Sequence, residues 1–503
     1  MSLIAVTEDD TTIGSDPPNP KLRTPSPRNV QASQRNSVSF NKEGTPPRAF
    51  AQLRERAEQM KKRRYVKARW ILASLLLASH LTGCYVVQRP APRGSPDHAY
   101  IDYWPAPENN KQLGLAIKDN IDMKGVVTSA GSQYLAETAQ PASRDADCLA
   151  IARKRNVRIV GKTTLSEFAL SPSGLNDYFG TPRDPFSKSW RRFIPGGSSS
   201  GSAAAVADGS ADVALGTDTA GSVRVPAACC GVVGLKTTFG LISIKGVFPV
   251  ESKHLDTVGP LGKDVAHVVQ GMDLLQNGFA TRYQTAVAAK PSAKDIRIGR
   301  LYLNGTDPKI DKAVDEALAQ TGFRVITLDR GFTAKWDQAK KDGNTVAAAG
   351  AWISGQNYRF KNRVRARTKA VILLGQILYP GQYRQALHRR AQWQSALSQA
   401  FRKVDFIALP TLQTLPPTIP FVGRIALLEA RVLNLQNTVA VNFAGNPALA
   451  IPIPVNDKTI PVTSLQLVGP RLSEAGLLNA GRLIELEHPE FERRISALEA
   501  KRH

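Results

Sequence analysis

The chain has 503 residues, of which 42% are hydrophobic, and its formal net charge is +24. This length is enough for a large core and for more than one domain's worth of structure, and the apolar fraction is ordinary for a soluble enzyme. No apolar run reaches the ~20 residues that a helix needs to span a bilayer. The basic balance favours anionic surfaces or substrates but does not determine a fold. The four cysteines form no CxxC pair, which disfavours a zinc ribbon or a thioredoxin-type motif.

Residues 1–59 are rich in Pro, Ser, Asn and charge, which predicts a disordered extension because such a segment buries too little apolar surface. The segment 60–84 differs: a basic stretch beginning at Met60 is followed by an apolar stretch and then by Leu81-Thr82-Gly83-Cys84. This order is typical of a secretory signal. Its ending resembles the lipobox of bacterial lipoproteins, which implies that Cys84 is lipidated and becomes the mature N-terminus.

Secretory signals begin near the N-terminus of a protein, whereas this pattern begins at residue 60. We therefore expect Met60 to be the true start, with residues 1–59 coming from an over-long gene prediction. The product would be exported and anchored to a membrane on the periplasmic side. The alternatives are a short buried or interfacial helix and a cytoplasmic protein. Residues 85–110 are predicted to be a tether, 111–490 the folded domain, and 491–503 a C-terminal tail.

From Leu113 onward, short apolar runs alternate with segments of helical spacing. Strands are predicted at Leu113–Ile117, Val157–Val160, Val213–Gly216, Val232–Leu235, Ile296–Leu301, Phe323–Leu328, Phe406–Pro410 and Ala448–Pro452. Helices are predicted at Asp145–Arg155, Val265–Leu275, Pro308–Gln320, Tyr383–Arg402, Ile425–Phe443 and Glu474–Glu485. This interleaved order predicts an α/β fold with a mostly parallel, buried sheet.

Residues 343–404 form a basic stretch with eleven Lys/Arg and no Asp/Glu, and its cations alternate strictly from Arg359 to Lys369. A nucleic-acid or phospholipid surface is one interpretation. We favour a solvated basic face, because Phe360 is the single aromatic residue inside the alternating run and no nucleic-acid-binding module is recognised. Nucleic acid is therefore not an expected partner.

Two loops of small residues, Gly196–Ser202 and Gly216–Ser222, flank an Ala/Val run. Glycine and serine at this density let a backbone approach a ligand and direct its N–H groups at it, and serines in such loops can be nucleophiles. The first loop matches G-x-S-x-G, centred on Ser199. That scheme needs a histidine and an acid, and no histidine of the chain lies in an informative context. The match is therefore weak evidence.

A serine nucleophile needs a base, and lysine can serve if burial lowers its pKa from ~10.4 towards neutrality. Lys118 is placed for this role, because it ends the apolar run Leu113–Ile117 and precedes a polar turn. A strand of that kind carries its last side chain from the core to a cleft. Taken alone, however, Lys118 would be interpreted as a lysine that simply leaves the sheet.

The run Ala116–Asn120 and the blocks Gly196–Ala203 and Gly216–Ala227 occur in this order, and together they resemble the amidase signature family. The resemblance covers roughly residues 100–490. Further matching segments are Gly161–Thr163, Ser166–Ala169, Gly180–Pro185, Gly231–Lys236, Asp256–Pro260, Leu409–Thr411, Gly445–Ala448 and Ser464–Gly469. The family implies a large mixed, mostly parallel β-sheet covered by helices on both faces. It also implies a small-molecule amide substrate, with no metal or organic cofactor.

Carried over to this sequence, the Ser–Ser–Lys triad of the family falls on Ser222, Ser198 and Lys118. Ser222 would be the nucleophile that accepts the acyl group. Ser198, which the family holds in a cis peptide, would relay the proton. Lys118, neutral at rest, would be the final base and later the acid for the leaving amine.

The oxyanion hole of the family falls on the backbone N–H groups of Thr219, Ala220, Gly221 and Ser222. Ala220 stands where many members have glycine, a change that keeps the backbone donor. The resemblance also implies supporting roles for Ser199, Asp218 and Arg224.

The predicted reaction is hydrolysis of a non-peptide carboxamide to a carboxylate and ammonia or an amine, through an acyl-enzyme. The alternative is the glutamine-hydrolysing A-type subunit of a tRNA-dependent amidotransferase, which works in the cytoplasm with partner subunits. That branch tends to place a basic pair before an Ile-Leu-Leu-Gly-type segment, whereas Ala370 and Val371 precede Ile372–Gly375 here. A non-catalytic binding protein is disfavoured because all three triad positions are occupied. The sequence does not identify the substrate or the oligomeric state.

Overall fold

The structure is a computed structural model that describes residues 88–105, 107, 112–420 and 425–488. The predictions for residues 1–59, for the signal-like segment 60–84 with Cys84, and for the tail 491–503 lie outside these ranges. The predicted tether 85–110 is wrong in part, because Tyr100–Tyr103 forms a strand that pairs with Gly161–Thr163 and so belongs to the folded domain. Within them, no helix has the length and apolar character needed to cross a membrane.

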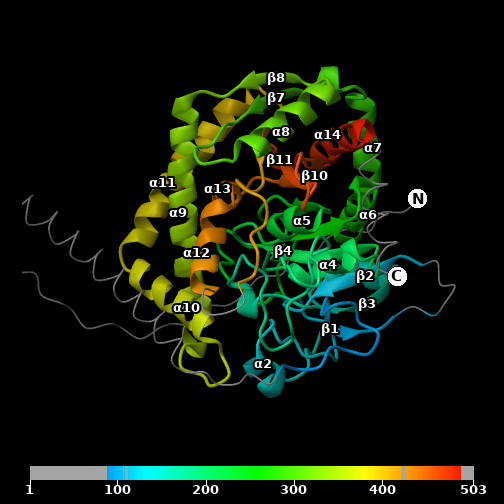
Figure 1. Ribbon diagram of the computed structural model, residues 1–503, viewed down its shortest axis with the longest axis vertical. Coiled ribbons are helices and arrows are strands. Elements are labelled where there is room, and N and C mark those ends of the chain that lie inside the picture. The colour runs from blue at the N-terminus through cyan, green and yellow to red at the C-terminus, as the bar shows by residue number, and fades with distance from the viewer. Residues whose placement is uncertain (1–87, 106, 108–111, 421–424, 489–503) are drawn as a thin grey trace, which may run out of the picture. The chain divides into compact units, whose positions relative to one another are not determined.

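The described residues contain one sheet of eleven strands, in the order β1-β3-β2-β4-β6-β5-β10-β11-β9-β7-β8 (Figure 1). The strands are β1 (Tyr100–Tyr103), β2 (Gly114–Lys118), β3 (Arg158–Thr163), β4 (Val213–Asp218), β5 (Val233–Lys236), β6 (Thr257–Gly262), β7 (Arg297–Arg300), β8 (Arg324–Thr327), β9 (Phe406–Pro410), β10 (Ala448–Pro454) and β11 (Val462–Val468). The helices around them are α2 (Gln133–Thr138), α3 (Ala150–Lys154), α4 (Ser200–Ala207), α5 (Arg224–Cys230), α6 (Val265–Leu275), α7 (Phe279–Ala289), α8 (Pro308–Thr321), α9 (Arg330–Gly355), α10 (Ala366–Leu378), α11 (Gln382–Phe401), α12 (Ile425–Leu435), α13 (Val439–Ala444) and α14 (Glu474–Glu487).

The α/β fold and the mixed sheet are confirmed, but the expectation that the sheet is mostly parallel is wrong. Four neighbouring pairs are parallel, β3–β2, β2–β4, β9–β7 and β7–β8. The other six pairs are antiparallel and include the whole centre of the sheet. An apolar run reports that both faces of a strand are buried, and it does not report the strand's direction. The sequence Thr-Val-Gly-Pro-Leu-Gly of β6 was also not predicted as a strand, because glycine and proline are poor strand formers.

Helices cover both faces of the sheet, as predicted. Leu115 and Ile117 of β2 join a core cluster that includes residues of α6 and α14. Ala116, on the opposite face, joins a cluster built on α4. Since side chains alternate along a strand, Lys118 shares the face of Ala116. Its side chain therefore points towards α4 and the loop that precedes this helix.

The predicted helices vary in accuracy. Val265–Leu275 coincides with α6, and the segments of α8, α11 and α14 are close to their predicted bounds. The helix predicted at Ile425–Phe443 is two helices, because Asn437 between them donates its N–H to Thr411 O and Gln436 bridges to Leu412. The 26-residue helix α9 and its neighbour α10 were not predicted. The alternating basic run crosses from a turn into α10, so it does not form one face of a strand.

Candidate active site

Lys118, the last residue of β2, is fully buried. Its Nζ lies 2.7 Å from Ser198 Oγ, and it donates to Thr217 Oγ1 at 2.8 Å and to Thr217 O at 3.4 Å. Burial lowers the pKa of Lys118 to about 7, although the charges of Asp218 and Asp256 act in the opposite direction. The amine is therefore poised between its two protonation states near neutral pH.

Thr217 determines how the amine of Lys118 is oriented. A neutral amine has two N–H donors and one lone pair. The two oxygens of Thr217 accept N–H groups from Nζ, which leaves the lone pair facing Ser198 Oγ. Asn120 Nδ2 donates to Thr217 Oγ1 at 3.0 Å and holds that hydroxyl in place. Neither residue was singled out by the sequence, although both lie inside the blocks that carry the family resemblance.

The first small-residue loop places Ser198 beside the lysine. The peptide bond between Gly197 and Ser198 is cis, as the family resemblance implies. Gly197 donates its N–H to Pro172 O at 2.8 Å, and Ser198 O accepts the N–H of Ser166 at 3.2 Å. A Cβ at Gly197 would lie 2.6 Å from Ser171 O, so only glycine fits there. The α4 helix begins at Ser200, directly after the loop.

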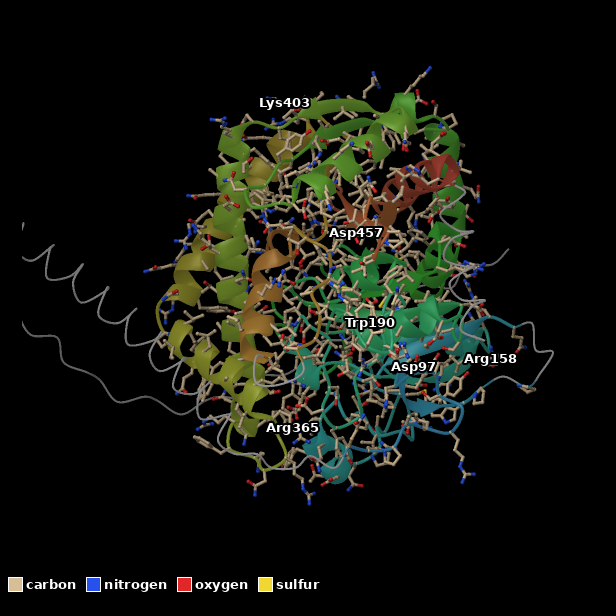
Figure 2. The ribbon with its side chains drawn as sticks, in the orientation of Figure 1. Asp97, Arg158, Trp190, Arg365, Lys403 and Asp457 are labelled. Atoms are coloured by element: carbon tan, nitrogen blue, oxygen red, sulfur yellow. The ribbon has the colours of Figure 1, made fainter. Side chains whose placement is uncertain are left out.

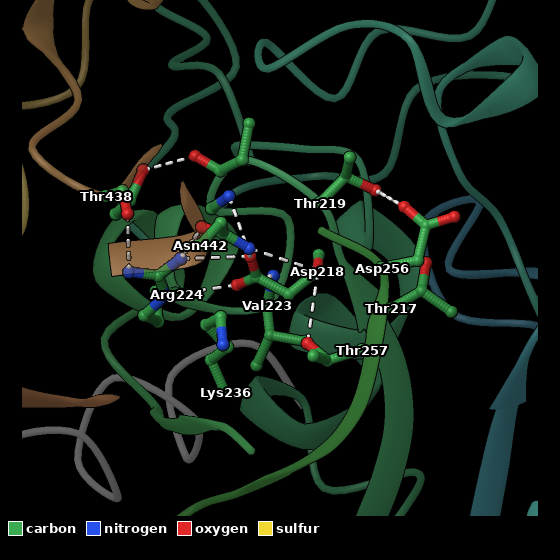
Figure 3. A network of polar contacts seen from close by, with 12 residues as sticks. Thr217, Asp218, Thr219, Val223, Arg224, Lys236, Asp256, Thr257, Thr438 and Asn442 are labelled. Atoms are coloured by element: carbon green, nitrogen blue, oxygen red, sulfur yellow. Dashed lines mark hydrogen bonds and ion pairs between the residues drawn. The ribbon is translucent and has the colours of Figure 1, made fainter. Parts of the chain in front are cut away.

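The second loop is folded around the buried carboxylate of Asp218, at the end of β4 (Figure 3). Asp218 accepts the N–H groups of Gly221 at 2.8 Å and Val223 at 3.1 Å. It forms a buried ion pair with Arg224, with distances of 3.0 Å and 3.1 Å. Burial raises the pKa of Asp218, but the charge and hydrogen bonds of Arg224, together with Lys236 and Asn442, bring it far below the ordinary value. The carboxylate thus stays ionised and fixes the loop.

Arg224 connects this loop to the C-terminal part of the chain. Its guanidinium donates to Thr438 O at 3.1 Å and to Asn442 Oδ1 at 2.5 Å (Figure 3). It also donates to Gln466 Oε1 at 2.7 Å. These three acceptors belong to elements that follow residue 430, so the predicted supporting positions of Asp218 and Arg224 form one buried network.

Ser222 lies at the turn between Gly221 and α5 and is half-buried. Its carbonyl oxygen accepts the N–H of Ser199 at 3.2 Å, so the two small-residue loops touch each other. Ser199 Oγ donates to Thr217 O at 3.3 Å. The structure therefore brings Lys118, Ser198, Ser199 and the Ser222 loop together, and Ser199 is occupied by structural hydrogen bonds.

The predicted oxyanion hole needs one correction. Gly221 donates its N–H to Asp218 Oδ1, so this group is not directed at a ligand. The N–H groups of Thr219, Ala220 and Ser222 remain as candidate donors. Two clamps hold their loop: Thr219 Oγ1 donates to Asp256 Oδ1 at 2.6 Å, and Thr438 Oγ1 donates to Ala220 O at 2.5 Å. Asp256 and Thr438 come from distant segments. Asp256 lies in the matching segment Asp256–Pro260, but the sequence assigned no role to either residue.

Two of the histidines that a G-x-S-x-G scheme could use have other partners. His254 Nδ1 lies 3.1 Å from a Glu251 oxygen, and His267 Nδ1 lies 2.7 Å from Asp264, which caps α6. Among the described residues, no cluster of three His, Cys, Asp or Glu side chains suits a metal ion. The buried amine and hydroxyls beside Ser222 instead define a hydrolase centre of the serine type.

Comparison with known proteins identifies the family. The family model described as Amidase matches residues 113–478, more than half of the chain. The chain therefore belongs to the amidase signature family, and it is an enzyme that hydrolyses carbon–nitrogen amide bonds. This confirms the resemblance and the reaction class predicted from the sequence.

Two relatives illustrate the breadth of this family. The chain is 32% identical over 418 residues to the A-type subunit of the glutamyl-tRNA(Gln) amidotransferase of Halobacterium salinarum, covering 74% of this chain and 94% of that protein. It is also 32% identical over 392 residues to 2-amino-5-chloromuconic acid deaminase of Comamonas testosteroni, covering 74% and 81%. Two relatives with different names therefore share the same identity with this chain.

Solved structures agree with this fold. The A-type subunit of the glutamyl-tRNA(Gln) amidotransferase of Thermotoga maritima superposes with a TM-score of 0.63 at 25% identity, over 77% of this chain and 86% of that one. A 6-aminohexanoate cyclic dimer hydrolase gives a TM-score of 0.66 at 22% identity, over 77% and 87%, and supports the fold alone.

Proposed function

We propose that the chain hydrolyses a small carboxamide through an acyl-enzyme on Ser222, with Ser198 and Lys118 carrying the proton. The observation that supports this proposal most strongly is the buried Lys118 amine 2.7 Å from Ser198 Oγ. The amine also donates to the two oxygens of Thr217. An amine in this environment accepts a proton near neutral pH, which is what a serine nucleophile requires.

In the proposed acylation step, Ser222 Oγ attacks the amide carbonyl carbon and forms a new C–O bond. Its proton passes to Ser198 Oγ, while the Ser198 proton passes to Lys118 Nζ. The N–H groups of Thr219, Ala220 and Ser222 stabilise the negative oxygen of the tetrahedral intermediate. When this intermediate collapses, the C–N bond breaks and the nitrogen takes the proton back through Ser198. Ammonia or an amine leaves, and the ester on Ser222 remains.

Water completes the reaction in the proposed second half. Its oxygen attacks the ester carbonyl while its proton follows the same path to Lys118. The second tetrahedral intermediate then releases the carboxylic acid, and Ser222 Oγ recovers its proton. The side chains Asp218 and Arg224 take no part in proton transfer; they hold the Ser222 loop in the geometry that both steps use.

The test uses a panel of aliphatic and aromatic primary amides and anilides, with release of ammonia or amine as the readout. Ser222→Ala and Lys118→Ala should each abolish hydrolysis, and a serine-reactive fluorophosphonate should label the parent but not the Ser222→Ala protein. Ser189→Ala is the matched control, because Ser189 is an exposed serine outside the site. Retained activity in either purified variant of the triad would refute the proposed roles.

A second candidate function is the glutamine-hydrolysing subunit of a tRNA-dependent amidotransferase. The similarity to the Halobacterium salinarum amidotransferase protein favours it. Ala370 and Val371, in place of the basic pair of that branch, oppose it. Ammonia release from glutamine, together with co-purification of partner subunits, would establish this candidate. Hydrolysis of small amides by the isolated chain, without activity on glutamine, would exclude it.

We also propose that the protein is exported and attached to a membrane through lipidated Cys84. The support is the order of basic, apolar and lipobox-like residues in 60–84. Mass spectrometry of the mature N-terminus should find an acylated Cys84, and Cys84→Ala should release the protein from the membrane fraction. A soluble protein that begins at Met1 would refute export and lipidation together.

A further inference from the structure

A short hairpin presents an exposed tryptophan between basic side chains. Lys188 bridges to Arg191 across the turn. Trp190, at the tip, is 66% exposed (Figure 2). Lys188, Arg191 and Arg192 are exposed as well, and Lys188 Nζ lies 6.0 Å from the centre of the Trp190 ring. Trp190 is thus the large apolar residue that this hairpin leaves in solvent.

The base of the hairpin is fixed, so the exposure of its tip is a property of the fold. Phe186 and Phe193 are buried in a cluster with Ile460 and Val462 at the start of β11. Phe193 donates its N–H to Ser187 Oγ at 2.9 Å and bridges to Thr418.

The same cluster brings the loop before β11 next to the hairpin and adds Lys458, which is exposed. We call the exposed residues of both segments the Trp190 surface: Lys188, Trp190, Arg191, Arg192 and Lys458. Its acidic neighbour is Asp457, which faces Arg191 and Lys309. Burial raises the pKa of Asp457, but backbone hydrogen bonds and these two cations lower the pKa overall. Asp177 lies in the same hollow as Arg192 but is paired with Arg367, so the four cations outnumber the carboxylates and leave the surface positive.

The Trp190 surface lies near the point where the chain enters the folded domain. Gln88 and Arg192 line one surface hollow, together with His98, Asp177 and Thr181. Cys84 precedes Gln88 by four residues, and four residues of extended chain span about 14 Å. An acyl chain on Cys84 and the Trp190 surface would therefore reach the same bilayer. A lipid anchor and a basic patch held beside it act on the same membrane together, which increases the strength of attachment.

We propose that the Trp190 surface docks on an anionic phospholipid bilayer. Lysine and arginine are attracted to anionic headgroups, and the indole ring prefers the depth of the headgroups, where its body is apolar and its N–H is wet. The surface offers one aromatic ring, too few for the stacking that single-stranded nucleic acid uses. The proposal does not depend on the catalytic mechanism, so loss of docking leaves amide hydrolysis in solution unchanged.

The experiment is sedimentation of the full chain with vesicles that contain phosphatidylglycerol, and with vesicles of phosphatidylcholine alone. Cys84→Ala is present in every protein, so that lipidation does not contribute. The test variant is Lys188→Ala/Arg191→Ala/Arg192→Ala. The control is Lys335→Ala/Lys341→Ala/Lys403→Ala, which removes three exposed lysines elsewhere; Lys403 lies far from Trp190 (Figure 2). Trp190→Ala is measured separately.

We expect the parent and the control to bind the anionic vesicles. The test variant should bind about 100-fold more weakly, because each basic residue near an anionic surface contributes roughly fivefold. Trp190→Ala should weaken binding to the same vesicles with no change in net charge. Equal binding by the test variant and the control would overturn the proposal. A test variant that binds vesicles as well as the parent but no longer binds an RNA or DNA duplex would also overturn the proposal.

Discussion

Lys118 and Lys236 are two fully buried lysines at the ends of strands β2 and β5. Burial lowers the pKa of each amine to about 7. Lys236 Nζ donates to the carbonyl oxygens of Thr237 and Asn446, both at 2.8 Å. Lys118 Nζ instead faces the Ser198 hydroxyl. The comparison teaches that a low lysine pKa does not by itself make a base; the hydroxyl at hydrogen-bond distance distinguishes the two regions.

Lys162, on β3 beside β2, shows a third arrangement. It is also fully buried, but its Nζ forms an ion pair with Asp119 at 3.1 Å and donates to Ile121 O at 2.6 Å. A buried pair of this kind is a structural element, because each charge compensates the other. Three buried lysines in one sheet thus differ in their partners: a carboxylate for Lys162, two carbonyls for Lys236 and a serine hydroxyl for Lys118.

The largest effect expected from this comparison is the loss of activity in Lys118→Met, with Lys236→Met as the matched variant. Methionine fills a similar volume without an amine. Lys118→Met should lower the rate of amide hydrolysis by ~10⁴-fold or more, as removal of a catalytic base does. Lys236→Met should retain a rate of the same order as the parent.

Measuring stability distinguishes a loss of catalysis from a folding defect in these two variants. Lys236→Met leaves two buried carbonyls without a donor, at a cost of ~1–3 kcal/mol each in the free energy of unfolding. It should therefore melt at a lower temperature and still hydrolyse amides below that temperature. An inactive Lys236→Met protein that remains folded would break the distinction between the two lysines.

The second prediction concerns Thr217, which orients Lys118. Thr217→Val keeps the side-chain volume and removes the hydroxyl that binds both Nζ and Asn120. The loss of such a hydrogen bond costs ~1–3 kcal/mol, so kcat should fall roughly 5- to 150-fold. Thr217 Oγ1 accepts a hydrogen bond from the amine and so favours its protonated form. Removing this acceptor should lower the pKa of Lys118 below about 7 and move the midpoint of the pH–rate profile to lower pH.

Thr217→Ser restores the hydroxyl and is the control for this effect. It should recover most of the rate and return the pH midpoint to that of the parent. A Thr217→Val protein with an unchanged rate and profile would show that Lys118 needs no orienting hydroxyl.

The sequence predicted the parts of the site that depend on local pattern. Lys118 ends an apolar strand, and the density of glycine and serine marked both loops. The roles of the partners that hold these parts in place were not predicted: Thr438 and Asp256 are ordinary residue types from distant segments, although Asp256 lies in a segment that matches the family. The sequence also did not predict the direction of the Gly221 N–H, because that direction depends on the position of the Asp218 carboxylate and not on residue type. For the same reason, apolar runs located the strands but not their antiparallel pairing.

The third prediction concerns the pKa values of Lys118 and Lys236, which the pH dependence of the free energy of unfolding tests. In the folded chain each amine loses its proton near pH 7, whereas in the unfolded chain it keeps the proton up to ~10.4. Between these values the unfolded state binds more protons, so the free energy of unfolding rises with pH. Each lysine should contribute a slope of up to about 1.4 kcal/mol per pH unit.

Denaturant unfolding between pH 7 and 8.5 tests this expectation in the parent and the two methionine variants. Lys118→Met and Lys236→Met should each remove a similar part of the slope, although only the first alters catalysis. A slope that changes in one variant alone would show that the two amines do not share the same proton affinity.

The smallest effect is expected at Ala220, in the loop that follows β4. Ala220→Gly keeps the backbone N–H and the carbonyl that accepts Thr438 Oγ1. Hydrolysis should therefore stay within a few-fold of the parent, with a loss of ~0.4–1 kcal/mol in stability from the greater freedom of glycine in the unfolded chain. Initial rates on a small amide and denaturant unfolding measure the two quantities.

The neighbouring change Gly221→Ala is the contrast to Ala220→Gly. Gly221 has φ of +136°, and a Cβ there would collide with Thr438 Oγ1. This added methyl must displace Thr438 and the loop together, so Gly221→Ala should lose most activity. Equal rates in the two variants would show that the clamp from Thr438 does not set the geometry of the Ser222 loop.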